Sequence, residues 1–116
     1  MPQSHNRTVP VWLLLMLVLC ILGTGLPVQA AHRSQADFVN ACRANSNLSE
    51  AVCTCSAQKA TRELSPDGFD LLVAVLENDE ATSASLRSKL PLAQTMQAAT
   101  FMTRGPSQCA KETAQR

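Results

Sequence analysis

Two cysteines separated by one threonine, Cys53 and Cys55, are the residues of this sequence best suited to chemistry. A Cys-x-Cys pair can bind a soft metal ion, act as a redox dithiol, or supply two anchors of a disulfide framework. Two more cysteines, Cys42 and Cys109, lie on either side of the pair, and the fifth, Cys20, lies in an apolar N-terminal run. The function predicted for the protein depends on which of these chemistries the pair performs.

The helix predicted around the pair restricts that chemistry. Residues 50–64 are mainly helix-forming types, and Ser49 is suited to cap their N-terminus. Successive residues of a helix are rotated by about 100°, so Cys53 and Cys55 point about 200° apart. On a continuous helix the two sulfurs can neither bond to each other nor bind one metal ion together. We therefore expect each sulfur to pair with a different cysteine.

Three disulfide pairings are open to Cys42, Cys53, Cys55 and Cys109. Cys42 lies late in one predicted helix and Cys53 early in the next, which favours a bond between them across an antiparallel hairpin. Cys55 would then bond to Cys109. The crossed pairing, Cys42 with Cys55 and Cys53 with Cys109, is nearly as good, whereas a bond between Cys53 and Cys55 requires an unwound helix.

The alternative to a framework is thiol redox or copper(I) chemistry at the Cys53-x-Cys55 pair. A redox thiol needs a nearby cation that lowers its pKa, and Lys59 lies one helical turn from Cys55. Copper(I) binding would use soft sulfur ligands, which Met96 and Met102 could complete. Methionines at helical spacing usually fill the core, so we predict no cofactor and no metal site.

The N-terminal 30 residues have the pattern of a secretory signal peptide. An apolar run of 18 residues, from Val9 to Leu26, precedes Pro27, and Val28 and Ala30 occupy the positions read by a signal peptidase. We therefore predict a signal peptide at residues 1–30, a single domain at residues 31–116, and a secreted or periplasmic protein. The alternative is an uncleaved membrane anchor, because 18 apolar residues just span a bilayer.

The remaining chain predicts an all-α fold, a small bundle of about four helices joined by two disulfides. Helix formers dominate, and no stretch alternates with the period of a strand. We expect Pro91 to end or kink a short helix, Gly105 to cap the last helix, and the polar tail from Pro106 to fray except where a disulfide at Cys109 holds it. The helices are predicted at residues 34–44, 50–64 and 66–76, around Leu86 and Leu90, and at residues 92–104.

Composition excludes several classes of function. Residues 31–116 contain nine Lys and Arg, ten in the chain minus Arg7, and nine Asp and Glu, so their formal charge is zero. Zero charge without a basic run argues against nucleic-acid binding. The domain has one histidine, His32, and no nucleophile or phosphate-loop motif, so we predict no enzymatic activity. A non-enzymatic module that binds a protein or a small apolar ligand is the leading hypothesis.

The last predicted helix is the expected interaction surface. It carries more apolar residues than one stripe can bury, and Met96, Phe101 and Met102 are the candidates for the exposed surface. Whether Phe101 lies on that surface or closes the core from another side is open at this stage. Asn47 begins an Asn-x-Ser sequon in the turn before Ser49, which a eukaryotic host could glycosylate.

Overall fold

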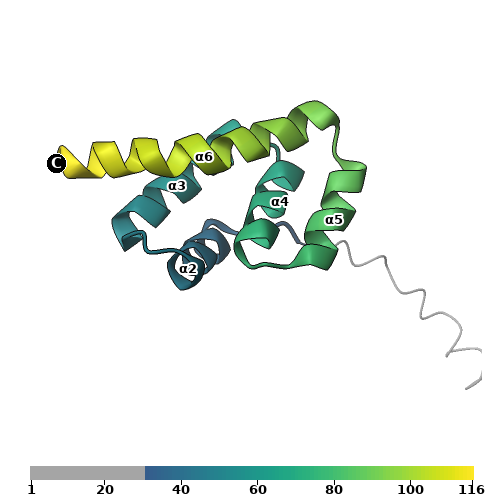
Figure 1. Ribbon diagram of the computed structural model, residues 1–116, viewed down its shortest axis with the longest axis horizontal. Coiled ribbons are helices and arrows are strands. Elements are labelled where there is room, and N and C mark those ends of the chain that lie inside the picture. The colour runs from purple at the N-terminus through teal and green to yellow at the C-terminus, as the bar shows by residue number, and fades with distance from the viewer. Residues whose placement is uncertain (1–30) are drawn as a thin grey trace, which may run out of the picture. The chain divides into compact units, whose positions relative to one another are not determined.

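The computed structural model describes residues 31–116, so the predicted signal peptide at residues 1–30 lies outside the described residues. These residues form one compact unit of five helices without a strand, which confirms the all-α prediction and corrects the predicted count of about four (Figure 1). The additional helix arises because Leu90, held extended before Pro91, separates two helices completely. The helices are α2 (Gln35–Asn45), α3 (Glu50–Glu63), α4 (Pro66–Leu76), α5 (Glu80–Lys89) and α6 (Leu92–Ala114).

Side-chain caps set the starts of α2 to α5. Ser34 and Asp37 form a capping box at α2, in which each side chain accepts the other residue's backbone N–H. Ser49 and Ser65 cap α3 and α4 in the same way, each accepting an N–H three residues along the chain. Asp79 performs this role for α5. The predicted starts at Ser34, Ser49 and Ser65 agree with these caps.

The prediction for the end of α6 was wrong. Gly105 was expected to cap the helix and the tail beyond it to be held only by a disulfide at Cys109, but α6 continues through Gly105 and Pro106 to Ala114, with the disulfide at Cys109 present. Gly105 is helical and buried, and a Cβ atom there would lie 2.6 Å from Cζ of Phe101. Its lack of a side chain therefore makes room for the Phe101 ring instead of permitting a left-handed cap. Pro106 removes one backbone donor, which one turn of an otherwise supported helix tolerates.

The core lies around α4, which contacts each of the four other helices. Leu72 and Val73 of this helix are almost completely buried, and the ring of Phe69 lies 5.8 Å from the ring of Phe38 in α2. Helix α6 extends along one side of the domain to the C-terminus and contacts α3 and α4 (Figure 1). Apolar stripes at helical spacing on four elements thus converge on one core.

Candidate functional site

The cysteines form two disulfides, between Cys42 and Cys53 and between Cys55 and Cys109. Their Cα–Cα distances are 5.9 and 5.8 Å, and the pairing is the one that an antiparallel α2–α3 hairpin favoured. Three of the cysteines are buried, and Cys55 is partly exposed. The two sulfurs of the Cys-x-Cys pair therefore reach different helices, as their angular separation required. Two disulfides in so small a unit indicate an oxidising compartment.

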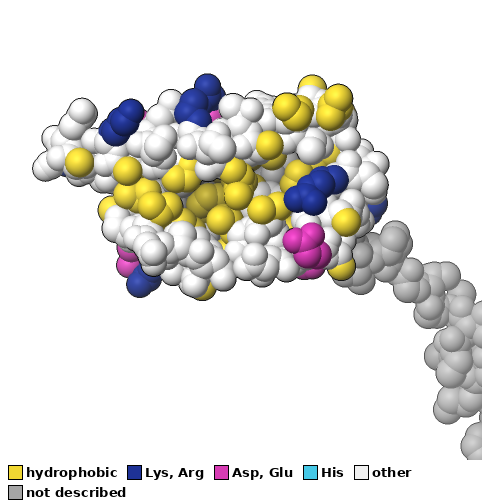
Figure 2. All heavy atoms as spheres, viewed as in Figure 1, with side chains coloured by type: hydrophobic (Ala, Val, Ile, Leu, Met, Phe, Trp, Pro, Cys, Tyr) yellow, Lys and Arg dark blue, Asp and Glu magenta, His cyan; other side chains and the backbone are white. Residues whose placement is uncertain are grey.

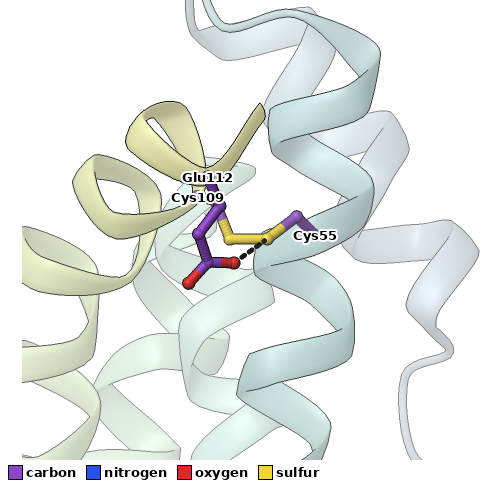
Figure 3. A group of neighbouring side chains, drawn as sticks. All are labelled: Cys55, Cys109 and Glu112. Atoms are coloured by element: carbon purple, nitrogen blue, oxygen red, sulfur yellow. Dashed lines mark hydrogen bonds between the residues drawn. A yellow bond between two sulfur atoms is a disulfide. The ribbon is translucent and has the colours of Figure 1, made fainter. Parts of the chain in front are cut away.

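The charges around Cys55 are not those of a reactive thiol. Lys59, the cation expected to make this face positive, forms an ion pair of 2.7 Å with Glu112. The other carboxylate oxygen of Glu112 lies 3.7 Å from Sγ of Cys55 (Figure 3). A disulfide sulfur has no proton to donate, so this is a contact between a carboxylate and a sulfur atom. An adjacent carboxylate disfavours a thiolate, which is the opposite of what a redox thiol needs.

Among residues 31–116, this is the one group of possible metal ligands that includes cysteines. Ligand atoms of Cys55, Cys109 and Glu112 lie within 4.8 Å of one another (Figure 3). Metal ligation by cysteine requires thiolates, and here the two sulfurs are bonded to each other. Only reduction of the disulfide would make them available as ligands.

A second polar group lies where the described chain begins. The imidazole Nδ1 of His32 lies 2.7 Å from Oδ2 of Asp70, and the backbone N–H of Arg33 donates to Oδ1 of the same carboxylate at 2.7 Å. The hydrogen bond and charge of Asp70 raise the pKa of His32 above its usual 6.5. Arg33 also forms an ion pair of 3.0 Å with Glu77. These contacts hold residues 32–33 on α4.

Sequence reasoning missed the partner in this group. It treated His32 as an isolated residue at a frayed end and assigned the acidic residues to caps and turns. Asp70 lies in the second turn of α4, too far along the helix for capping, and its side chain is only 17% exposed. The position of Asp70 beyond the first helical turn could have indicated a carboxylate with a tertiary partner. That partner, His32, lies 38 positions away and could not be identified from the sequence spacing.

Two neighbouring hollows lie beside α6, and we call them together the apolar groove. Their cavity volumes are about 240 and 230 Å³, and they share Leu72 and Met102. The first lies between α4, α5 and α6 and is also lined by Leu71, Val75, Arg87, Thr95, Ala98 and Ala99. The second lies between α2, α4 and α6 and is also lined by Phe38, Cys42, Ser46, Leu48, Leu76, Phe101 and Pro106. Each hollow is somewhat smaller than a typical ligand site.

The face of the domain in Figure 2 carries a band of hydrophobic side chains between α6 and the helices α2 and α4. Basic atoms, with acidic atoms beside them in this view, border this band at its α5 end (Figure 2). An exposed apolar strip beside a hollow is a candidate binding site.

The structure divides the three residues predicted for an interaction surface. Phe101 is 3% exposed and belongs to the core, which resolves the choice that the sequence left open. Met102 is 36% exposed and lines both hollows of the apolar groove. Met96 is 58% exposed but lines neither hollow, because it is rotated by about 120° from Met102 around the helix. Met102 and the buried Phe101 therefore line the groove, and Met96 does not.

Comparison of the chain with protein-family models, with curated proteins and with solved structures finds no match. Within residues 31–116, none of the helices combines the length and the apolar character that crossing a membrane requires.

Proposed function

We propose that this protein is a small exported module without catalysis of its own, which binds an apolar chain in the apolar groove. The single observation that carries the proposal is the largely apolar lining of two neighbouring hollows beside α6, which share Leu72 and Met102. Burial of apolar surface is the driving force that such a site can offer a ligand.

The framework around the groove supports a binding role. Cys42 and Phe101 line it and are at most 3% exposed, and Pro106 lies within α6 near the disulfide at Cys109. The groove walls are therefore fixed by covalent bonds and core packing. A preorganised wall lowers the entropy cost of binding, because fewer side chains must be ordered when the ligand arrives.

A location outside the cytoplasm is consistent with a structural role of the cysteines as disulfides. The proposed location is the periplasm or the outside of the cell, which the pattern of residues 1–30 and the two disulfides favour. The competing proposal, thiol redox or copper(I) chemistry at Cys53 and Cys55, requires free thiols. Titration of thiols in the denatured, unreduced protein separates the two, since a framework leaves none in residues 31–116.

The binding proposal is tested by filling the groove. Ala99 is exposed and lines the first hollow, so Ala99→Trp should obstruct the groove without disturbing the core. We expect this variant to bind an apolar fluorescent probe such as Nile red at least tenfold more weakly than the unaltered protein.

Ala93→Trp is the matched control, because Ala93 lies exposed on the same helix and lines neither hollow. Far-UV circular dichroism of both variants checks the fold. Equal probe affinity for the two tryptophan variants would show that the groove is not the binding site.

A further inference from the structure

One charged side chain breaks the apolar lining of the groove. Arg87, in the last turn of α5, lines the first hollow, and the other lining residues of both hollows are uncharged. Its guanidinium has no carboxylate within 4.0 Å among residues 31–116, which it shares with five other basic residues, and what sets it apart is its place in the lining of the groove. An arginine without a partner at the edge of an apolar site offers a fork of donors that matches a carboxylate or phosphate.

The groove has a direction. Along α6 its lining runs from Thr95, in the hollow that contains Arg87, to Pro106, in the hollow that contains Leu48. These 11 helical positions span about 16 Å at a rise of 1.5 Å per residue. The Arg87 end is therefore polar and the Leu48 end apolar, and the distance between them suits an extended hydrocarbon chain.

We propose that the ligand is a single-chain amphiphile with an anionic head group, of which a fatty-acid carboxylate is the simplest case. The head group pairs with the guanidinium of Arg87, and the chain extends past Leu72 and Met102 toward Leu48. This proposal rests on the proposed function, because it assigns a ligand class to the same groove. The choice of an anionic head group rests on Arg87, which is the one charged residue that lines either hollow.

Head-group charge is the first test. Isothermal titration calorimetry is carried out on protein expressed as the full chain and purified after export, with decanoate, 1-decanol and decyltrimethylammonium as probes. We expect decanoate to bind roughly fivefold more tightly than 1-decanol, because an exposed ion pair contributes up to about 1 kcal/mol. The cationic amphiphile should bind most weakly, and high salt should reduce these differences.

The Arg87→Gln variant should lose the preference for decanoate while retaining the affinity for 1-decanol. Lys89→Gln is the matched control, since Lys89 occupies the same last turn of α5 and lines neither hollow. Both residues are exposed, so neither substitution removes core packing. Loss of the preference in Lys89→Gln as well would assign it to the general field of the helix end and would overturn the role of Arg87.

Chain length and direction supply the second test. Affinity should rise about fourfold with each added methylene from hexanoate to decanoate, as burial of apolar surface predicts. Leu48→Ser should weaken binding of tetradecanoate but leave hexanoate unaffected, because only a chain about as long as the groove reaches that end. Equal weakening for both lengths would overturn the proposed direction.

The outcomes separate the ligand class from the proposed function. If 1-decanol binds as tightly as decanoate and Ala99→Trp weakens both, the groove binds apolar chains but the anionic head group is wrong. If no probe binds, or Ala99→Trp changes nothing, the proposed function fails together with the ligand class. A stable dimer in sedimentation that excludes every probe would make a second copy of the chain the occupant and would overturn the amphiphile.

Discussion

At the scale of single residues, the packing of Phe101 on Gly105 sets both the course of α6 and one wall of the groove. The ring occupies the position of the missing side chain, with three ring atoms within 2.9 Å of an added Cβ. Because Phe101 is buried, the ring cannot move aside into solvent. A glycine that would ordinarily weaken a helix therefore stabilises this one through its fit to an aromatic ring.

Gly105→Ala should destabilise the domain although alanine is the better helix former. Overpacking of a buried site costs about 1–3 kcal/mol, which exceeds the gain of about 1 kcal/mol in helix propensity. Urea denaturation followed by circular dichroism measures the change. The double variant Phe101→Leu/Gly105→Ala should recover part of the loss, and strict additivity of the two changes would contradict the proposed contact.

Two buried serines form a matched pair. Ser56 in α3 is completely buried, and its hydroxyl is the one buried side-chain group among residues 31–116 that lacks a hydrogen-bond partner. Ser83 in α5 is 2% exposed, but its hydroxyl donates to the carbonyl of Glu80 at 3.2 Å. We expect Ser56→Ala to raise the free energy of unfolding by about 1 kcal/mol and Ser83→Ala to lower it by a similar amount. Equal effects in chemical denaturation would contradict this assignment.

The His32–Asp70 contact predicts a dependence on pH. Since the folded-state pKa of His32 is raised above 6.5, its contribution to stability is fully present below pH 6.5 and is lost as pH rises through the folded-state value. NMR titration of the imidazole should give a pKa above 6.5 in the unaltered protein and a lower value in Asp70→Asn. An unchanged pKa in that variant would show that Asp70 is not the cause.

At the scale of elements, the parts predicted from the sequence were those that local chemistry determines. The starts of α2, α3 and α4 follow from cap residues a few positions away, and the hairpin of Cys42 and Cys53 follows from their equal distances from one turn. The end of α6 depends on a bond and an ion pair to α3 more than 50 positions away, which no local pattern contains. The groove was missed for the same reason.

The groove could not be predicted because several separate elements line it. Three residues of the last helix were proposed as a surface, but Phe101 is a buried wall of the groove, Met102 is its exposed member, and Met96 lines neither hollow. Arg87 had no distinguishing feature in the sequence, since a basic residue at a helix end is ordinarily explained by the helix dipole. Its neighbours on α4 and α6 give it a different environment, and these neighbours follow only from tertiary packing.

The two disulfides should contribute unequally to stability. The chain-entropy model gives about 3 kcal/mol for the bond that joins α2 to α3 and about 4 kcal/mol for the bond that joins α3 to α6, because the second closes the longer loop. We expect urea denaturation of Cys42→Ala/Cys53→Ala and Cys55→Ala/Cys109→Ala to follow this order. In the second pair, hydrogen exchange should also be faster beyond Pro106. The reverse order of stability would show that native packing outweighs loop closure.

At the scale of the whole molecule, the two disulfides add stability that the small hydrophobic core of 86 residues cannot supply alone. A domain of this size has a net stability of about 4–13 kcal/mol, so the two bonds together supply a large share of it. Reduction in solution should therefore lower the melting temperature strongly and cooperatively, as measured by far-UV circular dichroism. Unchanged melting after complete reduction would assign the cysteines a role other than stability.

The order of the four cysteines along the chain has a consequence for biosynthesis. If the protein is exported as proposed, with the N-terminus first, Cys42, Cys53 and Cys55 reach the oxidising compartment together, while Cys109 follows 54 residues after Cys55. In that interval Cys42 can form a disulfide with Cys53 or with Cys55. A bond to Cys55 would leave Cys53 to pair with Cys109, which is not the native pairing. Thiol–disulfide exchange must then correct the error before α6 closes over α3. The long final helix, which gives the mature domain its covalent closure, thus makes its maturation depend on an isomerase or on slow uncatalysed reshuffling.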